Sequence, residues 1–169
     1  MASPSPKRDH WHIAKAQPQD ARACCNVIRR SITETCARDY AHIPGFIAQW
    51  LSNKTPNLLR AWITATDGLF VVARAAATDA VIGVAQLSRR GEILLCYVDP
   101  QMLGRGLGHA LCAHLESHAQ TIRLAELSTT STITAHALYL RQGFLPSGDC
   151  LCAGLHPIGQ HMRKILLNP

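Results

Sequence analysis

Hydrophobic positions in the first third of the chain change from strand spacing to helical spacing. Residues 11–15 alternate at period two, which predicts a strand. Over residues 20–40 apolar side chains recur at helical spacing, and Asp20 stands where a capping residue is expected, so we predict one unbroken helix. Two shorter helices are predicted over residues 45–51 and 55–62, the second with a proline in its first turn.

The middle of the chain has the pattern of consecutive strands. Apolar and β-branched residues fill 69–74, 80–87 and 92–98. A polar Thr78-Asp79 turn separates the first two segments, and Gly91 introduces the third. Connections this short predict an antiparallel meander.

The last third alternates between the two periods. Helical spacing returns over residues 106–119, and a second helix is predicted over 132–142. A short strand over 124–128 lies between these helices, and strands over 144–153 and 160–167 end the chain.

The order of these elements predicts one folded unit. We expect residues 1–10 to form a flexible tail and residues 11–169 to form a single domain, because no repeat or linker divides the pattern. The predicted class is α/β, more strictly α+β, with a mixed, mostly antiparallel central sheet of about seven strands and about four flanking helices.

Composition narrows the class of protein. A hydrophobic fraction of 47% and a charged fraction of 17% are typical of a globular chain. No apolar run approaches the roughly 18 residues that cross a bilayer, and Met1 to Lys7 lacks a signal core, so we expect a soluble cytoplasmic protein without a membrane partner. Seven cysteines without regular spacing favour reduced thiols.

The net charge of +6 and the pI near 9.2 raise the question of an anionic partner. The basic residues are scattered in short pairs and do not form a stripe interleaved with aromatic residues, which argues against nucleic-acid binding. A basic surface also attracts anionic cofactors, although a solvated positive face is the simpler interpretation.

The most specific local feature is the segment Val98-Asp-Pro-Gln-Met-Leu-Gly104-Arg-Gly106-Leu-Gly108, where a strand passes through a glycine turn into a helix. Such a turn presents backbone N–H groups to an anion at the positive end of a helix. It lacks the Lys-Ser or Lys-Thr of a P-loop, and His109 occupies the last glycine position of a dinucleotide fingerprint. Both of those nucleotide-binding templates therefore fail.

The segment resembles the acetyl-CoA signature Q/R-x-x-G-x-G/A of the GNAT superfamily. In register, Gly106 and Gly108 match the two small residues, whereas Leu103 replaces the usual Gln or Arg and removes a side-chain partner. A second segment, Ala135-His-Ala-Leu-Tyr139-Leu-Arg-Gln-Gly143-Phe144, resembles the family's A-x-x-F/Y-Y-x-x-x-G-F segment. Thr132 stands where many members have Asn, and Ser131 or Thr132 could cap the helix instead.

The resemblance implies an N-acetyltransferase that moves an acetyl group from acetyl-CoA to a primary amine in a ternary complex. Tyr139 matches the family's general acid, and Glu92 resembles the general base of the histone-acetylating branch. The sheet is expected to splay beside the strand ending at Val98, where CoA inserts. Residues implied in acetyl-CoA binding are Cys96, Tyr97, Val98, Leu103, Gly104, Arg105, Gly106, Leu107, Gly108 and Thr132.

Alternatives remain open at this point. Tyr139 could be a packing residue, and Glu92 could be a strand-end charge. A non-catalytic acyl-CoA-binding module with the same fold is the main alternative function. Cys150 and Cys152 with nearby histidines could bind zinc, but no second close ligand pair exists, and we expect no metal. Tyr40, Trp50 and Trp62 could line the acceptor cleft or the core. The acceptor, a small molecule or a peptide, and a possible homodimer cannot be read from the residues.

Overall fold

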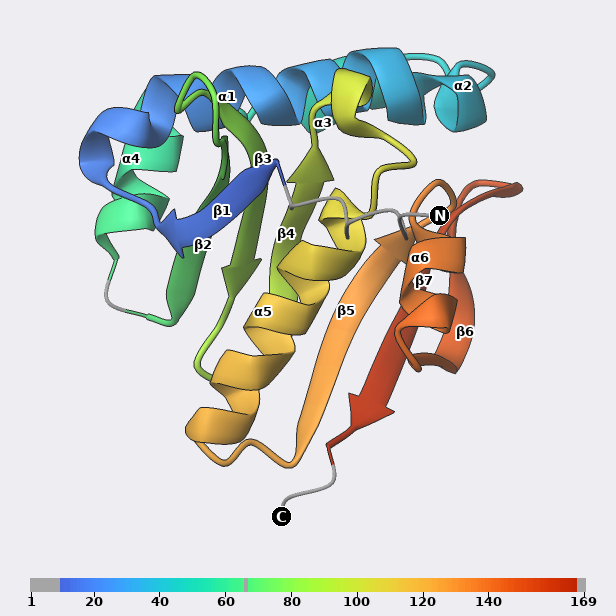
Figure 1. Cartoon of the computed structure of the whole chain (residues 1–169). Helices are drawn as coiled ribbons and strands as arrows, with labels where there is room; N and C mark the ends of the chain where they lie inside the picture. Colours follow the sequence, from blue (N-terminus) through green and yellow to red (C-terminus); the bar gives the residue numbers. More distant parts are fainter. Residues whose placement is uncertain (1–9, 66, 167–169) are drawn as a thin grey trace, which may run out of the picture.

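The computed structural model describes residues 10–65 and 67–166, which form a seven-stranded sheet in the order β1-β2-β3-β4-β5-β7-β6 (Figure 1). The tail predicted over residues 1–10 lies almost entirely outside the described residues. The strands are β1 (Trp11–Lys15), β2 (Leu69–Ala75), β3 (Val81–Leu87), β4 (Glu92–Val98), β5 (Glu126–Thr132), β6 (Leu145–Ala153) and β7 (His156–Ile165).

The helices are α1 (Ala21–Arg30), α2 (Ala37–Tyr40), α3 (Phe46–Leu51), α4 (Pro56–Thr64), α5 (Leu107–Thr121) and α6 (His136–Arg141). Short 3-10 turns η1 (Pro18–Asp20) and η3 (Pro100–Met102) and a π turn η2 (Ser31–Cys36) complete the elements. None of the helices within the described residues is long and apolar enough to span a bilayer. The predicted mixed, mostly antiparallel α/β architecture is confirmed.

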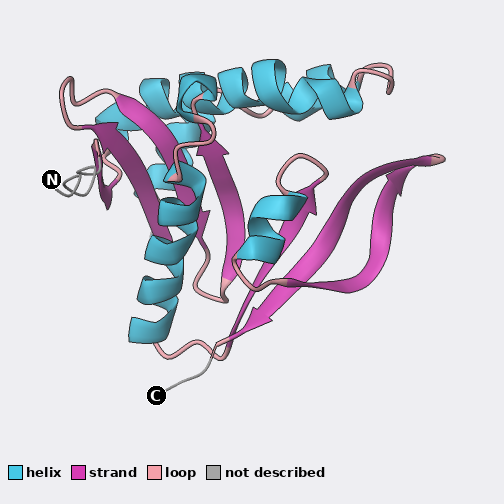
Figure 2. Cartoon of the chain, turned by 45° about the vertical axis from the view of Figure 1, so that its right-hand side comes forward, coloured by secondary structure: helices cyan, strands magenta, loops and turns pink. Residues whose placement is uncertain are grey.

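Side chains on neighbouring strand positions enter two different cores, as the period-two pattern requires. Val71 and Ala73 of β2 face helix α5 and join a core with Leu111 and Leu115. Val72, between them, faces the opposite side and packs with α1 and α4. Figure 2 shows α5 and α6 on one side of the sheet, with the β6–β7 hairpin curving away from the other strands.

The predicted helix over residues 20–40 is interrupted. Its middle, η2, is a π turn between α1 and α2, so one helical direction is kept but the hydrogen-bond pattern widens. Asp20 does not cap α1 with its side chain. Its carboxylate accepts a hydrogen bond from the Gln17 N–H at 2.8 Å and pairs with Arg74 at 2.6 Å, which ties the start of α1 to β2.

Strand β5 is longer than predicted and helix α6 starts later. The strand continues through Thr129 to Thr132, whereas the helix begins only at His136. Thr129 and Ser131 are buried although polar, and their hydroxyl groups donate to backbone carbonyl oxygens. Because serine and threonine occur on both faces of β5, its sequence lacks the alternation of apolar and polar residues that predicts a strand. Threonine is nevertheless β-branched and is favoured in strands.

The sheet opens between β4 and β5. These strands pair in parallel at only two positions, Glu92 with Ser128 and Ile93 with Thr129. Against β3, the pairing shifts by one residue at Leu94, which is a β-bulge. Beyond Ile93, the edge of β4 that faces β5 therefore has no strand partner, and Figure 1 shows the two strands diverging toward α1 and α2. This is the splay that the family resemblance implies.

Candidate active site

A cavity of about 740 Å³ occupies the opening between β4 and β5. It is lined from both sides of the sheet. At one end, which we call the glycine-turn end, Gly104, Gly106, Gly108 and Leu138 form the wall. At the other, the π-turn end, Ser31, Thr35 and Cys36 of η2 form it. One continuous space therefore connects the start of α5 with η2.

The glycine-turn end is built from backbone. Gly104 and Gly106 have φ values of +73° and +87°, a region that side chains other than glycine rarely adopt. A Cβ on Gly106 would point into open space. The first backbone hydrogen bond of α5 runs from the Ala110 N–H to the Gly106 oxygen at 3.0 Å, so the preceding N–H groups lack an intrahelical acceptor. This end can hold an anion such as a pyrophosphate.

Most of the residues singled out from the sequence line this one cavity. They are Cys96, Tyr97, Val98, Leu103, Gly104, Gly106, Leu107, Gly108, Thr132 and Tyr139. Arg105 is exposed and is not part of the wall. Thr132 does not cap helix α6. Its Oγ1 accepts a hydrogen bond from the Ala135 N–H at 3.1 Å, in the turn that precedes the helix. Ligand binding by these residues stays a prediction.

Tyr139 lies on α6 and is 4% exposed. Its ring packs edge-on against Phe144, with ring centroids 5.3 Å apart. Burial, and then the nearby thiols of Cys96 and Cys112, raise the pKa of Tyr139 well above its ordinary value. The phenol therefore stays protonated at neutral pH and has a proton to give, while the ring also fills the core.

Cys96 lines the cavity beside Tyr139, and its Sγ lies 3.7 Å from the Sγ of Cys112 on α5. The contact with Cys112, together with burial, raises the pKa of Cys96 above that of an ordinary thiol. A nucleophilic cysteine needs the opposite shift, toward the thiolate. This arrangement disfavours Cys96 as a nucleophile.

Glu92 lines a separate groove of about 200 Å³ on the exposed face of β5 and β7. Thr129 and Thr130 line both this groove and the main cavity, so the two spaces adjoin. His161 of β7 also lies in the groove, with its Nδ1 3.0 Å from the Thr130 Oγ1. Glu92 is thus placed at an approach to the cavity and does not line the cavity itself.

Tyr40 connects the elements around the π-turn end. Its hydroxyl donates to the Ile158 oxygen at 2.7 Å and accepts from the Ile133 N–H at 2.9 Å, which joins α2 to β7 and to the segment after β5. The ring stacks on Phe46 at 4.9 Å and meets Trp50 edge-on. Tyr40 is fully buried, so its role here is in the core.

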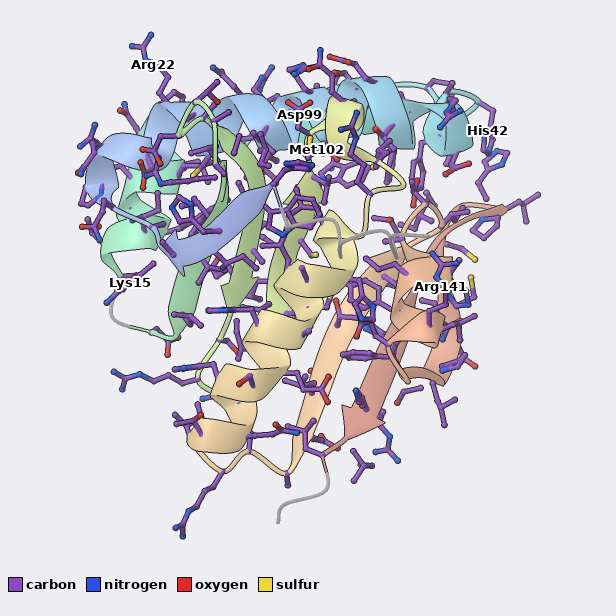
Figure 3. The ribbon with its side chains drawn as sticks, in the orientation of Figure 1. Lys15, Arg22, His42, Asp99, Met102 and Arg141 are labelled. Carbon is purple, nitrogen blue, oxygen red and sulfur yellow. The ribbon has the colours of Figure 1, made fainter. Side chains whose placement is uncertain are left out.

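Two further side chains that line the cavity were not predicted as site residues from the sequence. His109 follows the turn, and Arg141 ends α6, where Figure 3 labels it; both line the cavity. The buried Gln142 amide nitrogen lies 3.2 Å from the His109 backbone oxygen, which can only accept, and also contacts His109 Nδ1. Nδ1 must then be an acceptor, which leaves the ring proton on Nε2. Only the fold brings these residues together.

A buried carboxylate connects the two ends of the cavity. Asp99, 8% exposed, pairs with Arg30 of α1 at 2.5 Å, and its other oxygen accepts from the Gln101 N–H at 3.0 Å. Figure 3 shows Asp99 and Met102 together on the turn beneath α1. The same side chain thus shapes the start of the glycine turn and anchors it to the helix that leads into η2.

No cluster of three or more potential metal ligands occurs within the part of the chain that the structure describes. Cys150 and Cys152 are exposed on β6. The donor set that the sequence suggested for zinc is therefore not assembled.

The family model of the acetyltransferase (GNAT) domain matches residues 34–166. No curated protein matches the sequence. Among solved structures, a GCN5-related N-acetyltransferase from Rhodopseudomonas palustris is 22% identical, with a TM-score of 0.79 over 92% of this chain and 95% of its own.

Two further structures were solved with ligands. The PaiA N-acetyltransferase of Thermoplasma acidophilum, in complex with coenzyme A, is 21% identical, with a TM-score of 0.75 over 92% of this chain and 99% of its own. A phosphinothricin acetyltransferase from Sinorhizobium meliloti, in complex with acetyl-CoA, is 22% identical, with a TM-score of 0.67 over 93% of this chain and 89% of its own. These likenesses support the fold, and the family match covers most of the chain. The protein thus belongs to the GNAT family of acetyltransferases.

Proposed function

We propose that this enzyme transfers an acetyl group from acetyl-CoA to a primary amine by direct attack, with both substrates bound at once. The observation that supports the proposal is the cavity through the opened sheet, with a glycine turn at the start of α5 at one end and a wall without charged side chains at the other. An acyl donor and an acceptor can therefore meet inside the sheet without a covalent enzyme intermediate.

The glycine turn and the free N–H groups at the start of α5 would hold the CoA pyrophosphate. The edge of β4 beyond Ile93 has no strand partner and offers backbone groups to the pantetheine arm, beside Cys96 and Val98. Bound there, acetyl-CoA supplies an activated acyl group. Leu103 contributes no polar side chain, so backbone groups account for most of the binding.

In the transfer itself, the amine nitrogen bonds to the acetyl carbon and the carbon–sulfur bond breaks. Tyr139 gives its proton to the departing thiolate, because its hydroxyl is in the protonated form and its side chain lines the cavity. The surplus proton of the amine leaves toward the adjoining groove, where Glu92 takes it directly or through water. Glu92 then releases its proton to solvent and Tyr139 is reprotonated from solvent, so protons and charges balance over one turnover.

The wall at the π-turn end constrains the acceptor. Among the described residues that line the cavity, none is a carboxylate, and the only permanently charged one is Arg141, at the end of α6. An ammonium group would lose its hydration there without gaining a counter-charge. The acceptor should therefore lose its proton before the nitrogen enters the cavity.

The test is acetyl-CoA turnover with a panel of amines: an amino acid, an aminoglycoside, a polyamine, a peptide with a free N-terminus and a lysine peptide. We expect at least one amine to cause thiol release matched one-to-one by acetylated amine. Tight acetyl-CoA binding without amine-dependent thiol release from any of them would contradict the proposal and would favour a binding module.

A further inference from the structure

Leu94 is an apolar side chain that is left uncovered at the opening of the sheet. It lines the cavity and is 46% exposed, although its neighbours Ile93 and Leu95 are both buried. In the pairing of β4 with β3, Ile93 and Leu95 have partners and Leu94 has none, so Leu94 is the extra residue of the β-bulge. Bulges redirect side chains next to active sites, and this one leaves a leucine exposed on the cavity wall.

Leu94 lies on β4 between the two groups that the proposed reaction must bring together. Glu92, two residues earlier, is the proposed base and lines the adjoining groove. Both residues are exposed, on either side of buried Ile93, as expected for positions on one face of a strand. Cys96, two residues later, lines the cavity beside the proposed path of the pantetheine arm. Because the acceptor nitrogen has to lie between the base and the thioester, the acceptor should contact Leu94.

The hydroxyl groups on the cavity wall are largely engaged within the protein. Four threonines of the wall already have protein partners: Thr129 with the Ile93 oxygen, Thr130 with the His161 Nδ1, Thr132 with the Ala135 N–H and Thr134 with the Asp39 carboxylate. The Thr35 hydroxyl is buried inside the wall and is not reached from the cavity. A bound molecule gains few hydrogen bonds from such groups, so the wall offers the acceptor mainly apolar contacts.

The wall also lacks a counter-charge for a second charged group on the acceptor. Among the described residues no carboxylate lines the cavity, and Arg141, at the end of α6, is the only permanently charged side chain there. In the adjoining groove, Glu92 is the proposed base and Glu126 pairs loosely with Arg163 at 3.9 Å. A second ammonium group in the cavity would therefore lose its hydration without meeting an opposite charge. The net charge of +6 adds a longer-range repulsion of polycations.

We propose that the acceptor is a primary amine with one nitrogen on an uncharged aliphatic or aromatic body, and that Leu94 selects this body. This inference rests on the proposed amine acetylation and names the class of acceptor. The apolar body covers the exposed leucine and removes both surfaces from water. Polyamines and aminoglycosides, which carry several ammonium groups, are then poor acceptors.

A matched pair of substrates tests the class of acceptor. Heptylamine and 1,6-diaminohexane have chains of equal length, and a methyl group in the first takes the place of the second ammonium group in the other. The kcat/KM per reactive nitrogen should be at least about ten-fold higher for heptylamine. It should also rise about three-fold for each methylene from butylamine to heptylamine. An equal or higher kcat/KM for the diamine, or for the polyamine or aminoglycoside of the panel, would overturn the proposal.

The role of Leu94 is tested by Leu94→Asn, which keeps the approximate shape of the side chain and makes it polar. The kcat/KM for heptylamine should fall about ten-fold and that for butylamine less, whereas acetyl-CoA affinity measured by calorimetry should not change. The melting temperature should change little, because the side chain is half-exposed. Leu94→Met should keep the preference for longer chains. Leu94→Asp should narrow the difference between heptylamine and the diamine, because it supplies a counter-charge.

Leu58→Asn is the matched control, because Leu58 is 40% exposed on α4 and does not line the cavity. It should leave the dependence on chain length unchanged. The assignment of Leu94 is overturned if Leu94→Asn keeps the wild-type dependence on chain length, or if it loses acetyl-CoA affinity to the same extent as turnover. If the wild-type protein acetylates neither the alkylamines nor any amine of the panel, the proposed function itself fails, which is a different result.

Discussion

The two ends of the cavity are made from different parts of the polypeptide. The glycine-turn end is formed mainly by one short segment of backbone, with Gly104 and Gly106 in a left-handed conformation. The π-turn end is formed by side chains of η2, β4 and β5, which are distant in sequence. An end built from backbone can serve one constant ligand in many relatives, whereas an end built from side chains can change its acceptor by substitution.

Tyr139 lies between these ends, so its replacement should have the largest effect and should separate chemistry from binding. Tyr139→Phe keeps the ring that packs on Phe144 and removes the proton. We expect kcat to fall by about a hundred-fold or more, within the usual range for a positioned acid, with acetyl-CoA affinity and the melting temperature little changed.

The pH profile gives a second check on Tyr139. Its pKa is raised, so the acid form persists up to and beyond the ordinary tyrosine value of about 10. Below about pH 10, ionisation of Tyr139 should therefore cause no decline in wild-type kcat. Any alkaline decline in this range should also appear in the Phe variant. Wild-type turnover in Tyr139→Phe would exclude the acid role, and a lost fold would favour packing.

A substitution at Glu92 tests whether the groove that adjoins the cavity takes part in the reaction. In Glu92→Gln the amide cannot accept the proton of an arriving ammonium, so kcat should fall about ten- to a hundred-fold, most at low pH, without a change in acetyl-CoA affinity. Glu126→Gln, in the same groove but loosely paired with Arg163 at 3.9 Å, is the matched control. If the pH profile of Glu92→Gln matches wild type, the base lies elsewhere.

A substitution at Gly106 tests the glycine-turn end. Gly106→Val forces a β-branched residue into φ near +87° and places methyl groups where phosphate must approach, so acetyl-CoA affinity should fall about ten-fold or more. Gly148→Val is the control, because Gly148 has a similar φ of +84° with open space around it but lies on β6, away from the cavity. Equal affinity losses in both variants would show a general effect of strain.

His109 should give the smallest change. We expect His109→Ala to weaken acetyl-CoA binding about three- to ten-fold, because one uncharged donor near the pyrophosphate is lost and Leu103 offers no replacement. Turnover with S-acetylpantetheine, which lacks the phosphates, should not change. A loss with both donors would place the role of His109 outside phosphate binding.

Local features were predictable from the sequence, and features that depend on distant contacts were not. The strands and the glycine turn follow from spacing and residue type within short windows, as does the helix that carries Tyr139. The contact between Gln142 and His109 joins residues 33 positions apart and exists only in the folded chain. The π turn has the same apolar spacing as an α-helix, so periodicity alone predicts one unbroken helix over residues 20–40.

Most residues predicted for the site lie on the wall of one cavity, and their roles stay predictions. Cys96, Tyr97, Val98 and Tyr139 all line the cavity, whereas Arg105 is exposed outside it. The family resemblance implied a contact for Arg105, but in a turn of this kind the side chain can point away from the ligand. No pattern in the sequence indicates that Thr35 lines the cavity, because its place on the wall depends on the π turn.

The central claim is that the acetyl group crosses the opening between β4 and β5 directly, from acetyl-CoA to an amine. Single-turnover mixing with isotope-labelled acetyl-CoA, followed by intact-protein and small-molecule mass spectrometry, tests it most directly. The label should appear on the amine only when the amine is present, with no labelled protein at any time. Labelled protein that forms without the amine and is then cleared by it would contradict direct transfer and indicate an acetylated enzyme.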